Sequence, residues 1–203
     1  LKHLQGLATR GPALPFPRGD GTVCLALAVF CDASFGRQPK GGSQQGFCAL
    51  LGDRRVVTDY VDVPAALVNW SSTKIKRVVR STLAAEASSF ATGYDTAIRI
   101  QAMVSSILNP NDARHWSERI YDVPQINFND CKSLMDMAAK EGGVQSEKRT
   151  ALDFHDVRQY LDQGDLEHIS TNIMLADALT KHKSANERTA LEDFLETGLF
   201  SVH

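Results

Sequence analysis

A buried strand is predicted by Val23-Cys24-Leu25-Ala26-Leu27-Ala28-Val29-Phe30-Cys31-Asp32. The apolar run is continuous and closes on an aspartate, which is typical of a strand buried on both faces with a polar carboxyl end. Two further apolar runs follow, Gly46–Leu51 and Ala65–Trp70. The connections between the three runs are too short for helical crossovers, so we expect an antiparallel meander.

The hydrophobic period changes after the meander. From Ser81 to Leu108 there is no proline, and Gly93 alone interrupts an alanine-rich run of helix formers, which predicts a long helix with Ser81 as its N-cap. The pattern beyond it predicts, in order, a strand Pro124–Phe128, helices Lys132–Lys140 and Glu147–Leu161 separated by Gly142-Gly143, and a strand Leu166–Ile169. Helical chain is expected from Leu175, with a last amphipathic helix Ala185–Leu195. The apolar face expected for this last helix consists of Leu191, Phe194, Leu195 and Leu199. The fold class is therefore α/β, with a mixed five-stranded sheet and helices on both faces.

The composition of the whole chain is that of an ordinary globular protein. The 203 residues suit one domain, and Lys+Arg 22 against Asp+Glu 24 leaves a formal charge of −2. A phosphate-binding protein of this charge has to gather its cations locally. The four cysteines form no CxxC pair, which favours core thiols over a zinc site or a disulfide framework. No stretch is long and apolar enough to span a bilayer, so we expect no membrane partner.

Four carboxylates occupy positions where a stray charge would be costly. Asp32 closes the first strand, Glu86 lies in the first turns of the long helix, Asp130 closes the fourth strand and Asp177 begins a helical segment. Each has mostly apolar or small neighbours, and burying an unpaired charge there is expensive. Clustered carboxylates suit Mg²⁺, which prefers oxygen ligands. The alternative is four solvated acids, since aspartate at a strand end is also a common turn former.

A local cluster of positive charge precedes the long helix, at Lys74, Lys76, Arg77 and Arg80. It could follow the phosphates of one nucleic-acid strand, with hydroxyl contacts from Ser71, Ser72 and Thr73. Lys148 and Arg149 form a weaker second patch. The alternative interpretation is a solvated loop.

Several of these strings resemble the ribonuclease H domain of copia-type (Pseudoviridae-like) LTR retrotransposon Pol polyproteins. Asn69-Trp70-Ser71-Ser72-Thr73-Lys74 and Ser81-Thr82-Leu83-Ala84-Ala85-Glu86 are similar to the family's Trp-Ser-Ser-Lys-Lys and Ser-Ser-Thr-Glu-Ala-Glu, at the same separation. Leu175-Ala176-Asp177-Ala178-Leu179-Thr180-Lys181 resembles Leu-Ala-Asp-Ile-Leu-Thr-Lys. Cys31-Asp32-Ala33-Ser34-Phe35 and Asn129-Asp130-Cys131-Lys132-Ser133-Leu134 are similar to two further segments, in the same order, so the resemblance spans about residues 22–182.

The resemblance implies a ribonuclease H-like fold and cleavage of the RNA strand of RNA–DNA hybrids with two Mg²⁺ ions, Mn²⁺ being an alternative. The implied catalytic and metal-binding set is Asp32, Glu86, Asp130 and Asp177, with Asp32 bridging both ions, Glu86 and Asp130 sharing one, and Asp177 holding the other. Residues 22–182 would form the domain, 1–21 an arm from an upstream reverse transcriptase, and 183–203 a C-terminal helix and tail. The implied partners are the hybrid and that polymerase. The implied location is intracellular, in a cytoplasmic retrotransposon particle, with nuclear presence left open.

The chain departs from the family in its surroundings. Ser34, which we include among the substrate-binding residues, stands where many relatives have a second acid, and Ala151 replaces a histidine. His155 and His168 are candidates for a histidine that assists product release, although a surface or packed role is the simpler interpretation of each. Two other readings stay open: another nuclease such as an integrase or junction resolvase, and a non-catalytic hybrid-binding or host-adopted module.

Overall fold

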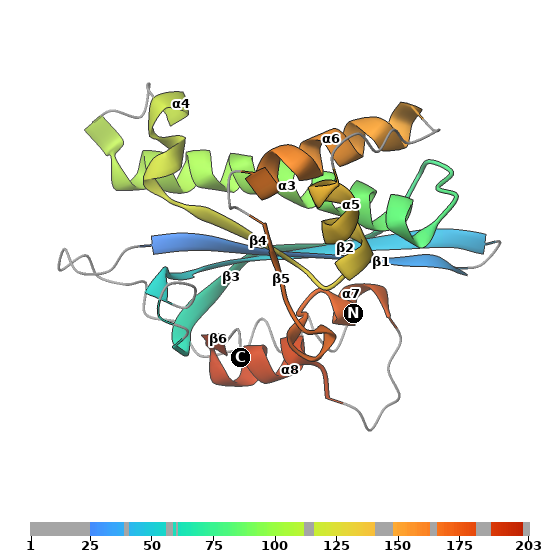
Figure 1. Cartoon of the computed structure of the whole chain (residues 1–203). Helices are drawn as coiled ribbons and strands as arrows, with labels where there is room; N and C mark the ends of the chain where they lie inside the picture. Colours follow the sequence, from blue (N-terminus) through green and yellow to red (C-terminus); the bar gives the residue numbers. More distant parts are fainter. Residues whose placement is uncertain are drawn as a thin grey trace.

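The computed structural model describes residues 25–38, 41–55, 59, 61–111, 116–140, 148–162, 166–181 and 188–200. Its centre is one sheet in the order β5-β4-β1-β2-β3-β6 (Figure 1). The long strands are β1 (Leu25–Gln38), β2 (Gly42–Asp53) and β3 (Val63–Lys74), which pair antiparallel as the short connections predicted. On the other side of β1, the strands β4 (Gln125–Asn129) and β5 (Leu166–His168) run parallel to it.

Helices cover both faces of this sheet (Figure 1). One layer holds α3 (Thr82–Leu108), α4 (Trp116–Arg119) with the 3₁₀ turn η3 (Ile120–Asp122), α5 (Lys132–Ala139) and α6 (Lys148–Asp162). The other layer holds η4 (Thr171–Ile173), α7 (Asp177–Thr180) and α8 (Ala190–Thr197), followed by β6 (Leu199–Phe200). Within the described residues, no helix is long and apolar enough to cross a membrane.

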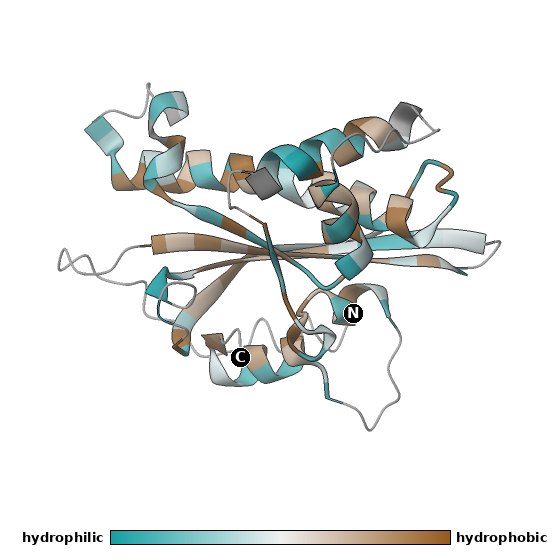
Figure 2. Ribbon diagram, in the orientation of Figure 1, coloured by the Kyte–Doolittle hydropathy of each residue, from teal (hydrophilic) through white to brown (hydrophobic). Residues whose placement is uncertain are grey.

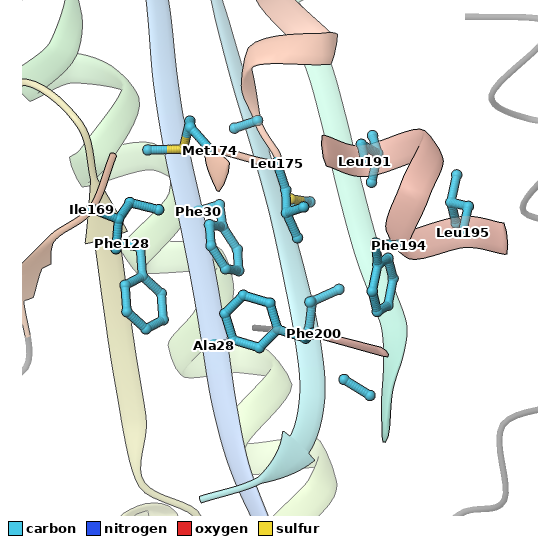
Figure 3. Packing of buried hydrophobic residues seen from close by; sticks show 14 of the residues in the cluster. Ala28, Phe30, Phe128, Ile169, Met174, Leu175, Leu191, Phe194, Leu195 and Phe200 are labelled. Atoms are coloured by element: carbon cyan, nitrogen blue, oxygen red, sulfur yellow. The ribbon is translucent and has the colours of Figure 1, made fainter. Parts of the chain in front are cut away.

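The face that carries α7 and α8 is packed around aromatic rings. Phe30 stacks on Phe128 at a centroid distance of 5.0 Å and meets the edge of Phe200 at 5.1 Å. Figure 3 shows Leu191 and Phe194 of α8 on the same side of the strands as these rings. The inner strands are largely apolar, whereas α5 and α6 carry many hydrophilic residues (Figure 2). Alternate residues of β1 therefore belong to two separate cores, one on each face.

The opposite face depends on a close approach between α3 and β1. Ser81 caps α3 as predicted, accepting a hydrogen bond from the backbone nitrogen of Ala84 at 3.0 Å. A Cβ at Gly93 would lie 2.3 Å from the sulfur of Cys31, so only glycine allows this helix to lie so near the strand. The glycine that interrupts the alanine-rich run is a packing requirement, and it fixes the distance between the helix that carries Glu86 and the strand that carries Asp32.

Three sequence-based expectations are corrected. The sheet has six strands and not five, because β6 pairs only Leu199 and Phe200 with β3 and is too short to show a period. Asp32 does not close β1, which continues to Gln38 as a hairpin with β2. Leu199, predicted to join the apolar face of the last helix, is 49% exposed, because Gly198 ends α8 in the left-handed region and turns Phe200 inward instead.

Other expectations fall outside the part of the chain that the structure describes. They concern the proposed arm at 1–21, the first residues of the predicted first strand, the break at Gly142-Gly143 and the start of the last helix at Ala185. Within the described residues, the predicted helices and strands are present with boundaries shifted by a few residues.

Candidate metal centre

Asp32 lies in the middle of β1 but beside the end of its parallel neighbour β4. The register pairs Phe30 with Phe128, so Asp130, which follows β4, stands level with Asp32. Asp32 is 1% exposed. Its Oδ2 accepts a hydrogen bond from the hydroxyl of Thr180, whereas its Oδ1 accepts none from the described residues. Because β4 ends at Asn129, the buried carboxylate of Asp32 has the less buried Asp130 as its neighbour.

Asp130 is held by the segment that follows β5. The hydroxyl of Thr171 donates to Oδ2 of Asp130 at 2.8 Å. His168, at the end of β5, is exposed, and its Nε2 lies 3.3 Å from the backbone oxygen of Asp130. The ladder between β4 and β5 therefore fixes the position of a carboxylate that is itself half-buried.

Asp177 is the first residue of α7, which lies directly on the sheet. A Cβ at Gly46 of β2 would come within 2.8 Å of the Cβ of Leu179 and 2.9 Å of the Cγ2 of Thr180. The hydroxyl of Ser72 on β3 donates to the backbone oxygen of Leu179, which ties the same helix to the next strand. The close approach at Gly46 brings Asp177 over the sheet to the level of Asp32.

The structure brings three of the four predicted carboxylates together. One oxygen of each of Asp32, Asp130 and Asp177 lies within 4.8 Å of the other two, although these residues come from three elements far apart in the sequence. Carboxylate oxygens at this spacing are ligands of the kind that hard divalent cations take. The donor set therefore fits a metal ion of that class.

Glu86 is not part of that group of three, but it lies nearby. It is 4% exposed, in the second turn of α3, and the amide nitrogen of Asn129 lies 3.5 Å from its Oε2. Asn129 also donates to the backbone oxygen of Cys31 at 2.9 Å. Asn129 thus links the fourth carboxylate to the strand that carries Asp32.

The proton affinities of the site reflect an excess of negative charge. Burial, together with the charges of Asp32 and Asp130, raises the pKa of Glu86 well above its usual range. Burial raises the pKa of Asp177 to about 6, opposed by its hydrogen bond to Lys181 and helped by the charge of Asp32. Without a bound cation, these acids hold their protons more tightly than exposed carboxylates do.

Sequence reasoning missed the cation that partly balances this charge. The ammonium of Lys181 lies 2.5 Å from Oδ1 of Asp177 and 3.3 Å from Oδ1 of Asp32. Burial acts to lower the pKa of Lys181, but the hydrogen bond to Asp177 and the charge of Asp32 outweigh it and raise the pKa. A sequence signal existed: Thr180 and Lys181 follow Asp177 at the spacings of one helical turn.

The comparisons with known proteins give no family. No protein-family model, no curated protein and no solved structure matches this chain. The site is therefore interpreted from its own geometry.

The predicted hydroxyl contacts differ in what they do. Ser72 accepts from the amide of Gln44 at 2.9 Å and donates to Leu179, so its role is to hold α7. The amide of Gln45 approaches the hydroxyl of Thr73 at 3.5 Å. Ser34 lies two residues beyond Asp32 on the same strand, is 4% exposed, and its hydroxyl has no partner among the described residues. Ser71 is partly buried on β3.

The basic segment, Lys74 to Arg80, borders a groove separate from the carboxylates. The groove has a volume of about 570 Å³, and Thr73, Lys74, Lys76 and Arg77 line one side of it. Residues of α3 and α6 line the other side, among them Ser88, Thr92, Asp95 and Asp153. Arg77 is ion-paired with Asp153. Arg80 is exposed and does not line the groove, and the side chains of Lys148 and Arg149 lie outside the described residues.

Proposed function

We propose that this protein is a metal-dependent ribonuclease H, which hydrolyses the RNA strand of RNA–DNA hybrids during reverse transcription of a copia-type retrotransposon. The observation that carries the proposal is the convergence of Asp32, Asp130 and Asp177 within 4.8 Å, with Glu86 buried beside them. These are the four residues that the family resemblance assigned to the catalytic set. Their convergence, from separate elements, supports that assignment.

The proposed roles are those that the family resemblance implies. Asp32 would contact both ions of a two-metal site. Glu86 and Asp130 would hold one ion and Asp177 the other. When bound, a pair of divalent cations supplies an activated water and stabilises the leaving oxygen of the phosphodiester.

Other side chains would position these carboxylates and the substrate. Thr180, Thr171 and Asn129 orient Asp32, Asp130 and Glu86 through the hydrogen bonds described above. The Ser34 hydroxyl, two residues beyond Asp32 on the same strand, is buried without a hydrogen-bond partner among the described residues, and it would contact a substrate group only if that group entered beside Asp32. Contacts to a 2′-hydroxyl would distinguish the RNA strand from DNA. The products would be a 3′-hydroxyl and a 5′-phosphate.

Substrate binding is assigned to the basic segment and the groove beside it. Lys74, Lys76 and Arg80 make no ion pair with other described residues, so their charges are available for phosphates. An upstream reverse transcriptase domain of the same polyprotein would supply further grip on the hybrid.

The deciding experiment is cleavage of a labelled RNA–DNA hybrid in Mg²⁺ by the parent protein and by Asp130→Asn. The matched control is Asp136→Asn, because Asp136 is an exposed aspartate on α5. Single-stranded RNA, duplex RNA and duplex DNA serve as competing substrates. Hybrid-specific cutting that Asp130→Asn abolishes and Asp136→Asn preserves would establish the activity and the site.

A folded parent that cuts nothing, alone or with its polymerase, would reject the enzyme. Specific hybrid binding in that case would identify a non-catalytic module. Cutting that prefers duplex DNA or a branched junction would point instead to an integrase-like or resolvase-like nuclease.

A further inference from the structure

Lys181 stands between two of the carboxylates rather than beside them. Its ammonium contacts Oδ1 of Asp177 at 2.5 Å and Oδ1 of Asp32 at 3.3 Å. That Asp32 oxygen is buried and accepts no hydrogen bond from the described residues. Its charge is balanced by the ammonium of Lys181. No corresponding ion pair joins Lys181 to Asp130 within the described part of the chain. The lysine is thus placed asymmetrically in the site.

We propose that the Lys181 ammonium is a resident counter-cation, which occupies the position of one of the two metal ions and must leave before that ion binds. The cation position between Asp32 and Asp177 is then the weaker of the two. The position between Asp32 and Asp130 fills first, because within the described residues no basic side chain forms an ion pair with Asp130. This inference rests on the metal site of the proposed function and is independent of the RNA–DNA substrate.

The geometry allows the exchange. The side chain of Lys181 is 27% exposed while that of Asp32 is 1% exposed, so the lysine can reach solvent and the aspartate cannot. Lysine carries its charge on a long flexible stem, and an ammonium is a compact point charge. Lys181 also follows the last residue of α7, so its movement need not disturb the helix that holds Asp177. The site would remain partly neutralised when empty and would bind the second ion only at higher metal concentration.

The test measures metal binding directly, without activity. Mn²⁺ titrations followed by electron paramagnetic resonance and by calorimetry would compare the parent, Lys181→Met and Lys181→Arg. Lys140→Met is the matched control, since Lys140 is exposed at the far end of α5 from Asp130. We expect one strong and one weak ion in the parent. The weak ion should bind about tenfold more tightly or better in Lys181→Met, the scale of one lost charge-assisted contact. Lys181→Arg and Lys140→Met should resemble the parent.

A second readout does not require the methionine variant to fold. Reductive ¹³C-methylation of the parent gives each lysine an NMR signal, and Lys181→Arg identifies the one from Lys181. This signal should move to the position of a solvated lysine as Mg²⁺ fills the second position, and not during filling of the first. A signal that does not move at saturating metal would overturn the exchange.

The outcomes separate the two proposals. Parent protein that binds two ions with affinities unchanged in Lys181→Met would overturn the role of Lys181 and leave the metal site intact. Binding by neither protein would overturn both the metal site and this inference. A first Mn²⁺ ion that binds in both proteins and a second that binds only in Lys181→Met would support the competition in its strongest form.

Discussion

The carboxylate centre and the basic segment contrast in how firmly the fold holds them. Asp32, Glu86 and Asp177 are each at most 4% exposed, and each lies on a closely packed strand or helix. Lys74, the last residue of β3, and Lys76 and Arg80, between β3 and α3, are exposed. Buried charges are costly and are kept where chemistry depends on their position. Exposed cations cost little, and they suit contacts that need attraction more than geometry.

The largest effect should follow from neutralising Glu86, whose negative charge is disfavoured by burial and by neighbouring carboxylates. Glu86→Gln removes a charge that burial and two neighbouring carboxylates oppose. We expect cleavage to fall by about 10²-fold or more, the scale of losing one electrostatic stabiliser. The same variant should raise the melting temperature in EDTA at a pH where Glu86 is ionised, because it removes the repulsion from Asp32 and Asp130. Hybrid cleavage rates and thermal unfolding measure the two effects, with Glu118→Gln, an exposed acid on α4, as the control. Full activity in Glu86→Gln would remove Glu86 from the centre.

The next effect tests whether close packing places the centre. Gly46→Ala adds a methyl group against Leu179 and Thr180 and should push α7 away from β2. Displacements of this kind can cost up to about 10²-fold in rate. Gly52→Ala is the matched control on the same strand, where the added Cβ meets Ala65 at 3.0 Å and no site residue. It should lower stability by about 1–3 kcal/mol and leave the cleavage rate unchanged below the unfolding transition.

Equal loss of cleavage in the two glycine variants would show that general destabilisation, and not the position of α7, sets the rate. Mn²⁺ affinity, measured alongside, should weaken in Gly46→Ala and stay at the parent value in Gly52→Ala.

The same contrast explains how far sequence reasoning could go. The meander and the long helix with its Ser81 cap were predictable, because apolar runs and capping residues are recognised within short windows. The three aspartates that the structure brings together were also among the candidates that local strings indicated. The convergence of Asp32, Asp130 and Asp177 depends on the register between β1 and β4 and on the position of α7 against the sheet. Both are long-range contacts, which a short stretch of sequence does not reveal. The spacing of Lys181 from Asp177 was visible in the sequence, but its ion pair with Asp32 was not, because that contact joins α7 to β1.

The basic segment shows the reverse limitation. Its charge was plain in the sequence, but the ion pair of Arg77 with Asp153 joins the segment to α6 and could not be foreseen. Arg77 is therefore a structural link as well as a candidate phosphate contact. A two-residue strand such as β6 also escapes prediction, because a pattern needs more residues than it has.

A smaller effect concerns the pH dependence of stability without metal. Burial raises the pKa of Asp177 from 3.8 to about 6, so the folded state binds its proton more tightly than the unfolded state does. The stabilising contribution of this group is full below its unfolded pKa and is lost as the pH rises through about 6. The Asp177→Asn variant has no titrating group at this position, so its stability does not fall in this way. In EDTA, its melting temperature should therefore gain on that of the parent between about pH 4 and pH 7. A constant difference across that range would show that Asp177 does not titrate there.

The smallest effects belong to the basic segment and provide the sharpest test of its looser role. Lys76→Ala and Arg80→Ala each remove one exposed cation and should weaken hybrid binding only several-fold, with a salt slope smaller by about 1 for each lost phosphate contact. Cleavage at saturating hybrid should be unchanged, because neither side chain contacts the carboxylates. Fluorescence anisotropy at several salt concentrations measures the slope, and Arg99→Ala, an exposed cation far along α3, is the control. An unchanged salt slope in both variants would show that the basic segment does not contact the hybrid. A lower cleavage rate at saturating hybrid would show that the segment acts in the carboxylate centre, contrary to the separation of the two regions.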